Sequence, residues 1–128
     1  MVESVYHIWF STKGRKEALQ GELGEDVRRL LTATAQRAGI RLLEVDVAVD
    51  HVHLLVALAE GQTLPSVMHQ LKGASARSIS LKHSELKLDM GHNSFWQKGY
   101  GFHRLSSAEV SKMRRYIRTQ AARPLRRH

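Results

Sequence analysis

The chain has 128 residues, 42% of them hydrophobic, which is enough for the core of one domain and leaves little room for a second. It contains no cysteine, which excludes disulfides and thiolate metal sites and is compatible with the cytoplasmic location that we expect. There is no apolar run near 18 residues and no basic-then-apolar leader, so we expect neither a membrane span nor secretion. The formal net charge of +8 favours a polyanionic partner, although a basic protein without a nucleic-acid role is the alternative.

Apolar periodicity predicts seven elements in the order strand, helix, strand, strand, helix, strand, helix. The expected strands are Val5–Phe10, Arg41–Val49, His51–Leu58 and a glycine-broken segment at Ser94–Leu105. The expected helices are 25–38, ending at Gly39; 64–83, after an N-cap at Thr63 with Pro65 in the first turn; and a last one from Ser106 to Arg123-Pro124. Ser106 and Glu109 match a capping box.

This order suggests a single antiparallel sheet covered by helices. We expect a ferredoxin-like (RRM-like) α+β sandwich with an extra C-terminal helix that carries a tyrosine. Residues 1–128 form one domain in this interpretation, with a flexible tail after residue 122.

The segment Val49–Val56, "VDHVHLLV", places two histidines two residues apart in an apolar strand. Side chains alternate across a strand, so His51 and His53 point to one face and the intervening apolar residues point to the other. Two imidazoles on one face can converge on a divalent ion. A solvent-facing or hydrogen-bonded pair is the ordinary alternative, and a metal would need a third, polar ligand.

The C-terminal helix contains "YIRTQ", in which Tyr116 and Gln120 are four residues apart and share a helix face. The amide oxygen of Gln120 can bind a hard metal ion. The phenol of Tyr116 belongs to the class of covalent nucleophiles, while a tyrosine that packs on the sheet is the alternative.

Four segments in order resemble one known family: "DHVHLLV", "LKGASAR" at 71–77, "WQKGYGF" at 96–102 and "YIRTQ". They are similar to the HUH (histidine-hydrophobic-histidine) single-tyrosine DNA nickases, in particular the transposases of the insertion-sequence 200/605 type and the REP-associated tyrosine transposases. The resemblance runs from about Val5 to Gln120. One departure is Thr119, where the family often has asparagine.

The resemblance implies a DNA transposase that nicks and rejoins single-stranded DNA through a 5′-phosphotyrosine. Tyr116 would be the nucleophile, and His51, His53 and Gln120 would bind Mg²⁺ or Mn²⁺. No nucleotide cofactor would be needed, and we find no phosphate-binding glycine loop. Relatives recognise hairpins near element ends and form homodimers whose sheets join edge to edge, so the same partners are expected here.

Basic side chains are expected to contact DNA phosphates, with simple surface charge as the alternative: Lys13, Arg15, Lys16, Lys72, Arg77, Arg115 and Arg118. Neither His92 nor His103 is assigned to the metal. Asp50 is interpreted as a turn residue, with the orientation of a ligating histidine as the alternative. Two rival functions are a catalytically idle single-strand-binding module and a phosphoesterase that activates water on the histidine pair.

Overall fold

The computed structural model describes residues 4–84 and 95–121, except the side chains of residues 120 and 121. Its strands are β1 (Ser4–Ser11), β2 (Arg41–Val47), β3 (His51–Leu58) and β4 (Gly101–Leu105). Its helices are α1 (Gly21–Ala38), α2 (Leu64–Lys82), α4 (Ser107–Ala121) and the short 3-10 turn η1 (Lys13–Arg15).

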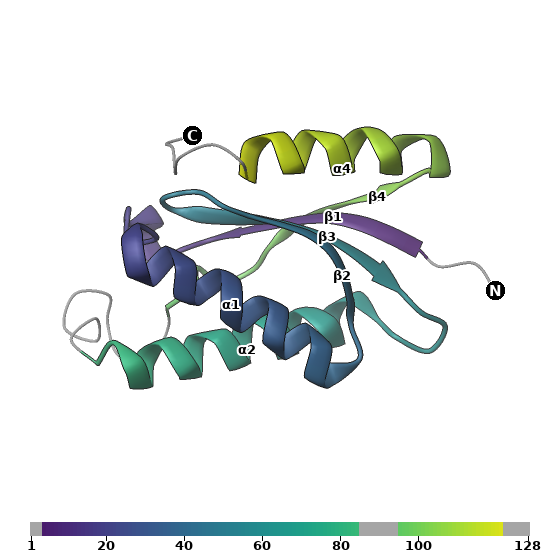
Figure 1. Ribbon diagram of the computed structural model, residues 1–128. Helices are drawn as coiled ribbons and strands as arrows, with labels where there is room; N and C mark the ends of the chain where they lie inside the picture. The colour runs from purple at the N-terminus through teal and green to yellow at the C-terminus, as the bar shows by residue number, and fades with distance from the viewer. Residues whose placement is uncertain (1–3, 85–94, 122–128) are drawn as a thin grey trace.

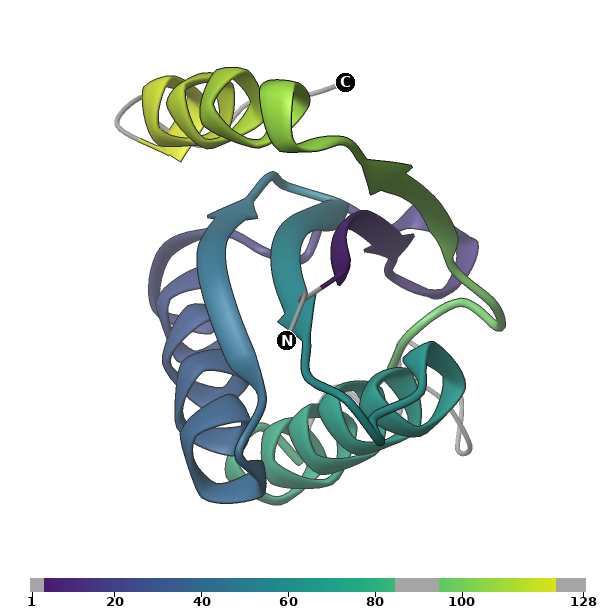
Figure 2. The same cartoon turned by 90° about the vertical axis from the view of Figure 1, so that its right-hand side faces the viewer.

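The four strands form one antiparallel sheet in the order β2-β3-β1-β4. Helices α1 and α2 cover one face of this sheet, and α4 lies across the other (Figure 1). The end-on view in Figure 2 shows the same three layers. This is the ferredoxin-like topology with an added C-terminal helix, so the expected fold is confirmed.

Alternation along β3 sorts its side chains between two cores. Val52, Leu54 and Val56 lie in the main core, which α1 and α2 cover. Leu55 points to the opposite face and belongs to a smaller cluster under α4, together with Leu105 and Ile117. His51 and His53 have the same parity as Leu55, so the expected division of the strand is confirmed.

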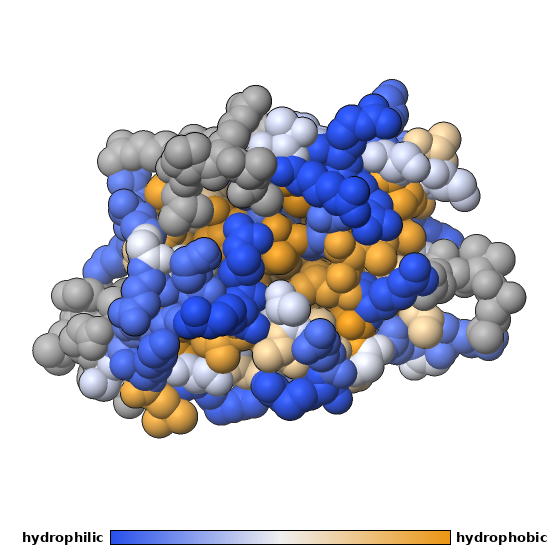
Figure 3. Space-filling model, in the orientation of Figure 1, coloured by the Kyte–Doolittle hydropathy of each residue, from blue (hydrophilic) through white to orange (hydrophobic). Residues whose placement is uncertain are grey.

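Helix α4 is held to the sheet by both apolar and charged contacts. Besides the cluster around Leu55, the carboxylate of Glu44 in β2 accepts hydrogen bonds from Arg114 at 3.0 Å and from Arg118 at 2.8 Å. Figure 3 shows apolar side chains gathered in the band between α4 and the layer of α1, with hydrophilic residues over the helices.

The local stop and start signals lie where the sequence indicates. Gly39 ends α1 in the left-handed region with φ of 70°, where glycine pays no steric cost. The Thr63 hydroxyl accepts the Ser66 N–H at the start of α2. Ser106 and Glu109 form a reciprocal box, because each side chain accepts the other residue's backbone N–H.

Several expected boundaries are wrong. Helix α1 begins four residues earlier than Glu25, which the sequence does not indicate because Gly21 and Gly24 in its first turn have low helix propensity and favour a loop. Strand β2 ends at Val47, where the Ala48 N–H bonds to the His51 carbonyl and closes the turn. Of Ser94–Leu105, only β4 is a strand, since Gly99 has φ of 88° and leaves the extended region. Ser94, the 87–93 stretch and the chain after residue 121 lie outside the described residues.

Candidate active site

The site is centred on the two histidines of β3. Nε2 of His51 lies 3.0 Å from Nε2 of His53, and the two rings meet edge to face. His51 is buried, with 7% of its surface exposed, while His53 is half-buried. The two Nε2 atoms therefore converge on one point on the sheet face that α4 covers.

Asp50 sets the orientation of the first histidine. Its Oδ1 lies 2.7 Å from Nδ1 of His51, and Arg15 holds its Oδ2 at 3.1 Å. Burial alone would raise the pKa of Asp50, but the hydrogen bonds from His51 and Arg15 outweigh it and lower the pKa. The charged carboxylate therefore accepts a hydrogen bond from Nδ1–H of His51, so Asp50 is more than the turn residue that the sequence indicates.

His7 of β1 is a residue that sequence reasoning missed. Its Nε2 lies 3.1 Å from Nδ1 of His53, and the two rings stack with centroids 5.3 Å apart. Burial lowers the pKa of His7, and the charge of His103 lowers it further, which favours a neutral ring. The "VYHIWF" segment shows that His7 and Trp9 share a face, but only the pairing of β1 with β3 brings His7 to His53.

The histidine pair fits an octahedral divalent ion. Two nitrogens bound at about 2.1 Å and at right angles to each other are about 3.0 Å apart, which is the separation of the two Nε2 atoms. Among the described residues, no group of three or more histidine, cysteine or acidic side chains could complete a metal site. Gln120, the third ligand expected from the sequence, lies in α4 with a side chain outside the described residues.

Tyr116 lies in α4, on the same side of the sheet as the histidine pair, and 48% of its surface is exposed. Helical geometry places it about 160° around the axis from Arg118, which bonds to Glu44 on β2. The tyrosine therefore does not pack in the apolar cluster that its neighbour Ile117 joins. This exposure leaves the phenol accessible to a substrate.

A cavity of about 260 Å³ lies beside His51. Its lining includes an aromatic wall and three basic or amide groups: Trp9, Tyr100, Arg15, Gln97 and Lys98. The Trp9 indole lies directly over Gly101, where any side chain would clash with it. An aromatic and cationic wall next to the histidines suits a nucleotide, because bases stack on rings and phosphates pair with cations.

The basic residues expected to contact DNA fall into two groups. Lys13, Lys16, Arg77 and Arg115 lie on the surface. The other three make contacts within the fold: Arg15 with Asp50, Arg118 with Glu44, and Lys72 with backbone carbonyls. These internal contacts do not exclude DNA binding, so all seven contacts stay predictions.

Lys72 ties α2 to the segment before β4. Its Nζ donates to the carbonyl of Gln97 at 2.9 Å and to that of Gly99 at 2.6 Å, and it lies 5.5 Å from the centroid of the Phe10 ring. Burial lowers its pKa. Lys72 thus supports one wall of the cavity beside His51.

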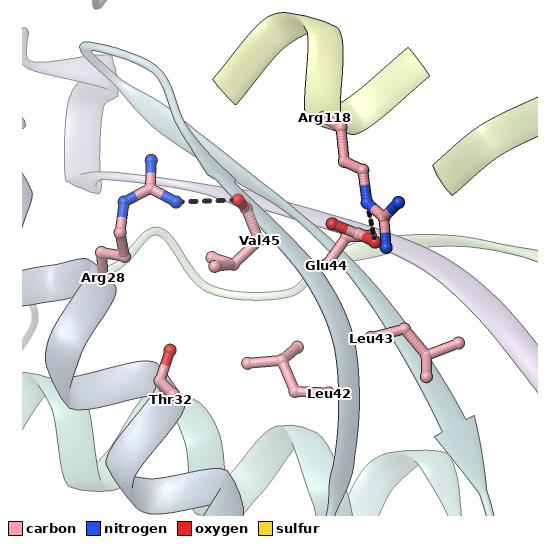
Figure 4. A pocket seen from close by; sticks show the side chains of 7 residues that line it. All are labelled: Arg28, Thr32, Leu42, Leu43, Glu44, Val45 and Arg118. Carbon is pink, nitrogen blue, oxygen red and sulfur yellow. Dashed lines mark hydrogen bonds and ion pairs between the residues drawn. The ribbon is translucent and has the colours of Figure 1, made fainter. Parts of the chain in front are cut away.

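A second concavity, of about 510 Å³, runs along the outer edge of β2 (Figure 4). Arg28 of α1 reaches across it and donates to the Val45 carbonyl at 2.9 Å. Arg118 bonds to Glu44 at its opposite side. One outward carbonyl of this edge strand is therefore already bonded within the chain.

The fold and the site define a ferredoxin-like domain with a two-histidine platform on one sheet face and a tyrosine-bearing helix over that face. Residues 1–120 match the family model described as "Transposase IS200 like". The chain therefore belongs to the IS200-like transposase family, which confirms the resemblance seen in its motifs.

Two curated relatives agree with this family. The chain is 30% identical over 115 residues to the ISDra2 transposase TnpA of Deinococcus radiodurans, a match that covers 90% of this chain and 82% of that protein. It is also 30% identical over 115 residues to the transposase for insertion sequence element IS200 of Salmonella typhimurium, with 90% and 75% covered.

Two solved structures share the fold. A crystal structure assigned to a transposase of Deinococcus radiodurans R1 is similar with a TM-score of 0.77 and 28% identity, covering 94% of this chain and 92% of that one. The REP-associated tyrosine transposase bound to a REP hairpin is similar in fold, with a TM-score of 0.64, 15% identity, and 89% and 64% covered. No helix within 4–84 or 95–121 is long and apolar enough to cross a membrane.

Proposed function

We propose that this transposase nicks and rejoins single-stranded DNA by transesterification, with Tyr116 as the nucleophile. In the nicking step the bond between the Tyr116 oxygen and the scissile phosphorus forms while the bond from phosphorus to the 3′ oxygen breaks. The phenol loses its proton and the departing 3′ oxygen gains one. Rejoining is the reverse attack of a 3′-OH on the phosphotyrosine, so no nucleotide is consumed.

The observation that carries this proposal is the convergence of the Nε2 atoms of His51 and His53 at 3.0 Å. In the proposal these two atoms and the amide oxygen of Gln120 hold Mg²⁺ or Mn²⁺. A bound divalent ion polarises a phosphate oxygen and offsets the charge that develops on it. The exposed phenol of Tyr116 lies in the helix over the same sheet face.

Hairpin-containing single strands are the proposed substrate. The formal charge of +8 supports a nucleic-acid partner. The REP-associated tyrosine transposase of similar fold is solved with a REP hairpin, which supports the same kind of ligand here. The cavity beside His51, with Trp9 and Lys98 in its wall, has room for an unpaired nucleotide.

A homodimer is part of the proposal. Within the described part of the chain, the sheet has two open edges, at β2 and β4, and an unpaired strand edge favours pairing with another chain. The bond from Arg28 to the Val45 carbonyl occupies part of the β2 edge, so β4 is the better candidate. If the site is shared between subunits, mixed dimers of His51→Ala and Tyr116→Phe should regain nicking, and proven mixed dimers that never nick would exclude sharing.

The decisive test is whether the protein forms a covalent adduct with DNA. The protein is incubated with Mn²⁺ and single-stranded oligonucleotides that carry hairpins from the DNA flanking its gene, and adducts that survive denaturation are separated on a gel. Wild type should form one, and Tyr116→Phe should abolish it while DNA binding persists. Tyr6→Phe is the matched control, because Tyr6 packs against Phe102 away from the histidines and should keep the adduct.

The rival functions give different results in the same assay. Cleavage that survives Tyr116→Phe would indicate a phosphoesterase that activates water on the histidine pair. Binding with no cleavage of any hairpin would indicate an idle single-strand-binding module.

A further inference from the structure

His7 of β1 contacts the ring nitrogen of His53 that faces away from His51. Its Nε2 lies 3.1 Å from Nδ1 of His53, while Nε2 of His53 lies 3.0 Å from Nε2 of His51. We propose that His7 is a positioning residue that fixes the ring orientation and the tautomer of His53, and that ion binding reverses the hydrogen bond between them. This inference rests on the proposed metal-dependent function and adds a residue to its site.

Asp50 fixes the tautomer of His51, the first of the three rings. A carboxylate can only accept a hydrogen bond, so the 2.7 Å contact puts the His51 proton on Nδ1. The Nε2 of His51 then carries a lone pair directed at His53. Asp50 thereby settles the tautomer of the first ligand, as carboxylates commonly do for metal-bound histidines.

His53 needs the same arrangement to act as the second ligand. If its Nε2 is to offer a lone pair to an ion, its proton must sit on Nδ1, which lies 3.1 Å from Nε2 of His7. His7 must then accept this proton's hydrogen bond and carry its own proton on Nδ1. The stacking of the His7 and His53 rings, 17° from parallel, limits rotation of His53 away from this position.

In the proposed metal-free state one proton lies between the two Nε2 atoms, because two facing lone pairs 3.0 Å apart would repel. His53 then donates from Nε2 to His51, and its Nδ1 accepts from Nε2–H of His7. With an ion held by both Nε2 atoms, His53 and His7 would instead carry their protons on Nδ1. Each of the three rings would hold one proton in both states, so the exchange would involve no net gain or loss of protons.

Two variants test this role in the full chain. In His7→Gln the amide oxygen can replace Nε2 as the acceptor for His53. In His7→Leu the new side chain has no acceptor atom. Long-range ¹⁵N spectra of the histidine rings report each tautomer with and without Mg²⁺, and the electron paramagnetic resonance of free Mn²⁺ gives the affinity. We expect Mg²⁺ to convert His53 and His7 of wild type to the Nδ1–H form. We expect Mn²⁺ affinity to fall about 10- to 100-fold in His7→Leu and to stay within about threefold in His7→Gln.

His69→Leu is the matched control, because His69 is an exposed histidine of α2, which covers the sheet face opposite to that of His53. It should leave the affinity within about threefold. An unchanged affinity and an unchanged His53 tautomer in His7→Leu would overturn the positioning role, as would a His7→Gln variant as weak as His7→Leu. Thermal unfolding of each variant verifies that it folds.

The same spectra distinguish a protein that binds no metal from one in which His7 has no positioning role. If Mg²⁺ moves no histidine signal of wild type, the proposed metal-dependent function fails. The role of His7 is then decided by the metal-free spectra, in which His7→Leu should shift the Nδ1 signal of His53, because that nitrogen loses the hydrogen bond from His7. An unchanged Nδ1 signal would overturn the role.

Discussion

Leu55 of β3 and Ile117 of α4 are both fully buried in one apolar cluster, which joins the strand of the histidine pair to the helix of Tyr116. Leu55 lies two residues after His53 on the same face, and Ile117 directly follows Tyr116. The position of the phenol relative to the histidines therefore depends on a small core separate from the main one.

We expect Leu55→Ala and Ile117→Ala each to lower the free energy of unfolding by about 2–5 kcal/mol, because each leaves a cavity. Because the two side chains share a cluster, the double variant should lose less than the sum, with a coupling of about 0.5–3 kcal/mol. Urea denaturation measures the free energy of unfolding of wild type, the two single variants and the double variant. Strict additivity would mean that α4 is anchored independently of Leu55.

Asp50→Asn should weaken Mn²⁺ binding by about 10- to 100-fold, because His51 loses the charged partner that fixes its tautomer. The backbone carbonyl of Asp50, which accepts from the Thr12 N–H, is unaffected by the change, so the turn should hold. Titration of the protein with Mn²⁺ measures the fall in affinity. Glu60→Gln, at an exposed acid between β3 and α2, is the control and should bind as wild type does.

Lys72→Met should lower the stability of the fold in addition to removing a predicted phosphate contact. It leaves the carbonyls of Gln97 and Gly99 without their donor, so we expect a loss of about 1–3 kcal/mol. Arg115→Met, at an exposed helix position, should leave stability nearly unchanged. On single-stranded DNA, Arg115→Met should reduce the salt slope of binding by about 0.7, the value for one phosphate contact.

Comparing the salt dependence of DNA binding between Lys72→Met and Arg115→Met separates a structural role from a phosphate contact. An equal fall in the slope for Lys72→Met would mean that its ammonium group reaches a phosphate despite its two carbonyl partners. An unchanged slope for Arg115→Met would remove Arg115 from the DNA contacts.

The capping box at the start of α4 should make the stability of the protein depend on pH in the acid range. The Ser106 N–H donates to Glu109 and lowers the pKa of its carboxyl, and the Ser106 side chain and His103 add to this. A depressed folded pKa contributes stability above the usual value for glutamate, and this is lost as pH falls through the lowered pKa. Glu109→Gln should therefore be less stable than wild type at neutral pH and converge with it in acid, as measured by urea denaturation.

Sequence periodicity determined most of the architecture. The two-residue period of β3 assigned Val52 and Leu54 to one face and His51 and His53 to the other, because alternation is a local property of an extended backbone. The caps at Thr63 and Ser106 were readable for the same reason, since each is a contact between residues three apart. The early start of α1 was not predicted, because its first turn contains Gly21 and Gly24, whose low helix propensity indicates a loop.

The tertiary structure alone decided which groups support the histidine pair. His7 meets His53 across 46 positions of sequence, through the register of β1 against β3. Arg15 reaches Asp50 across 35 positions, and Lys72 finds its carbonyls 25 and 27 residues away. The sequence thus determined the two histidines, the face of β3 that they share and the presence of the tyrosine helix, while the structure showed that this helix lies over the same face. The neighbours that orient those groups depend on strand pairing between distant segments, which no local pattern encodes.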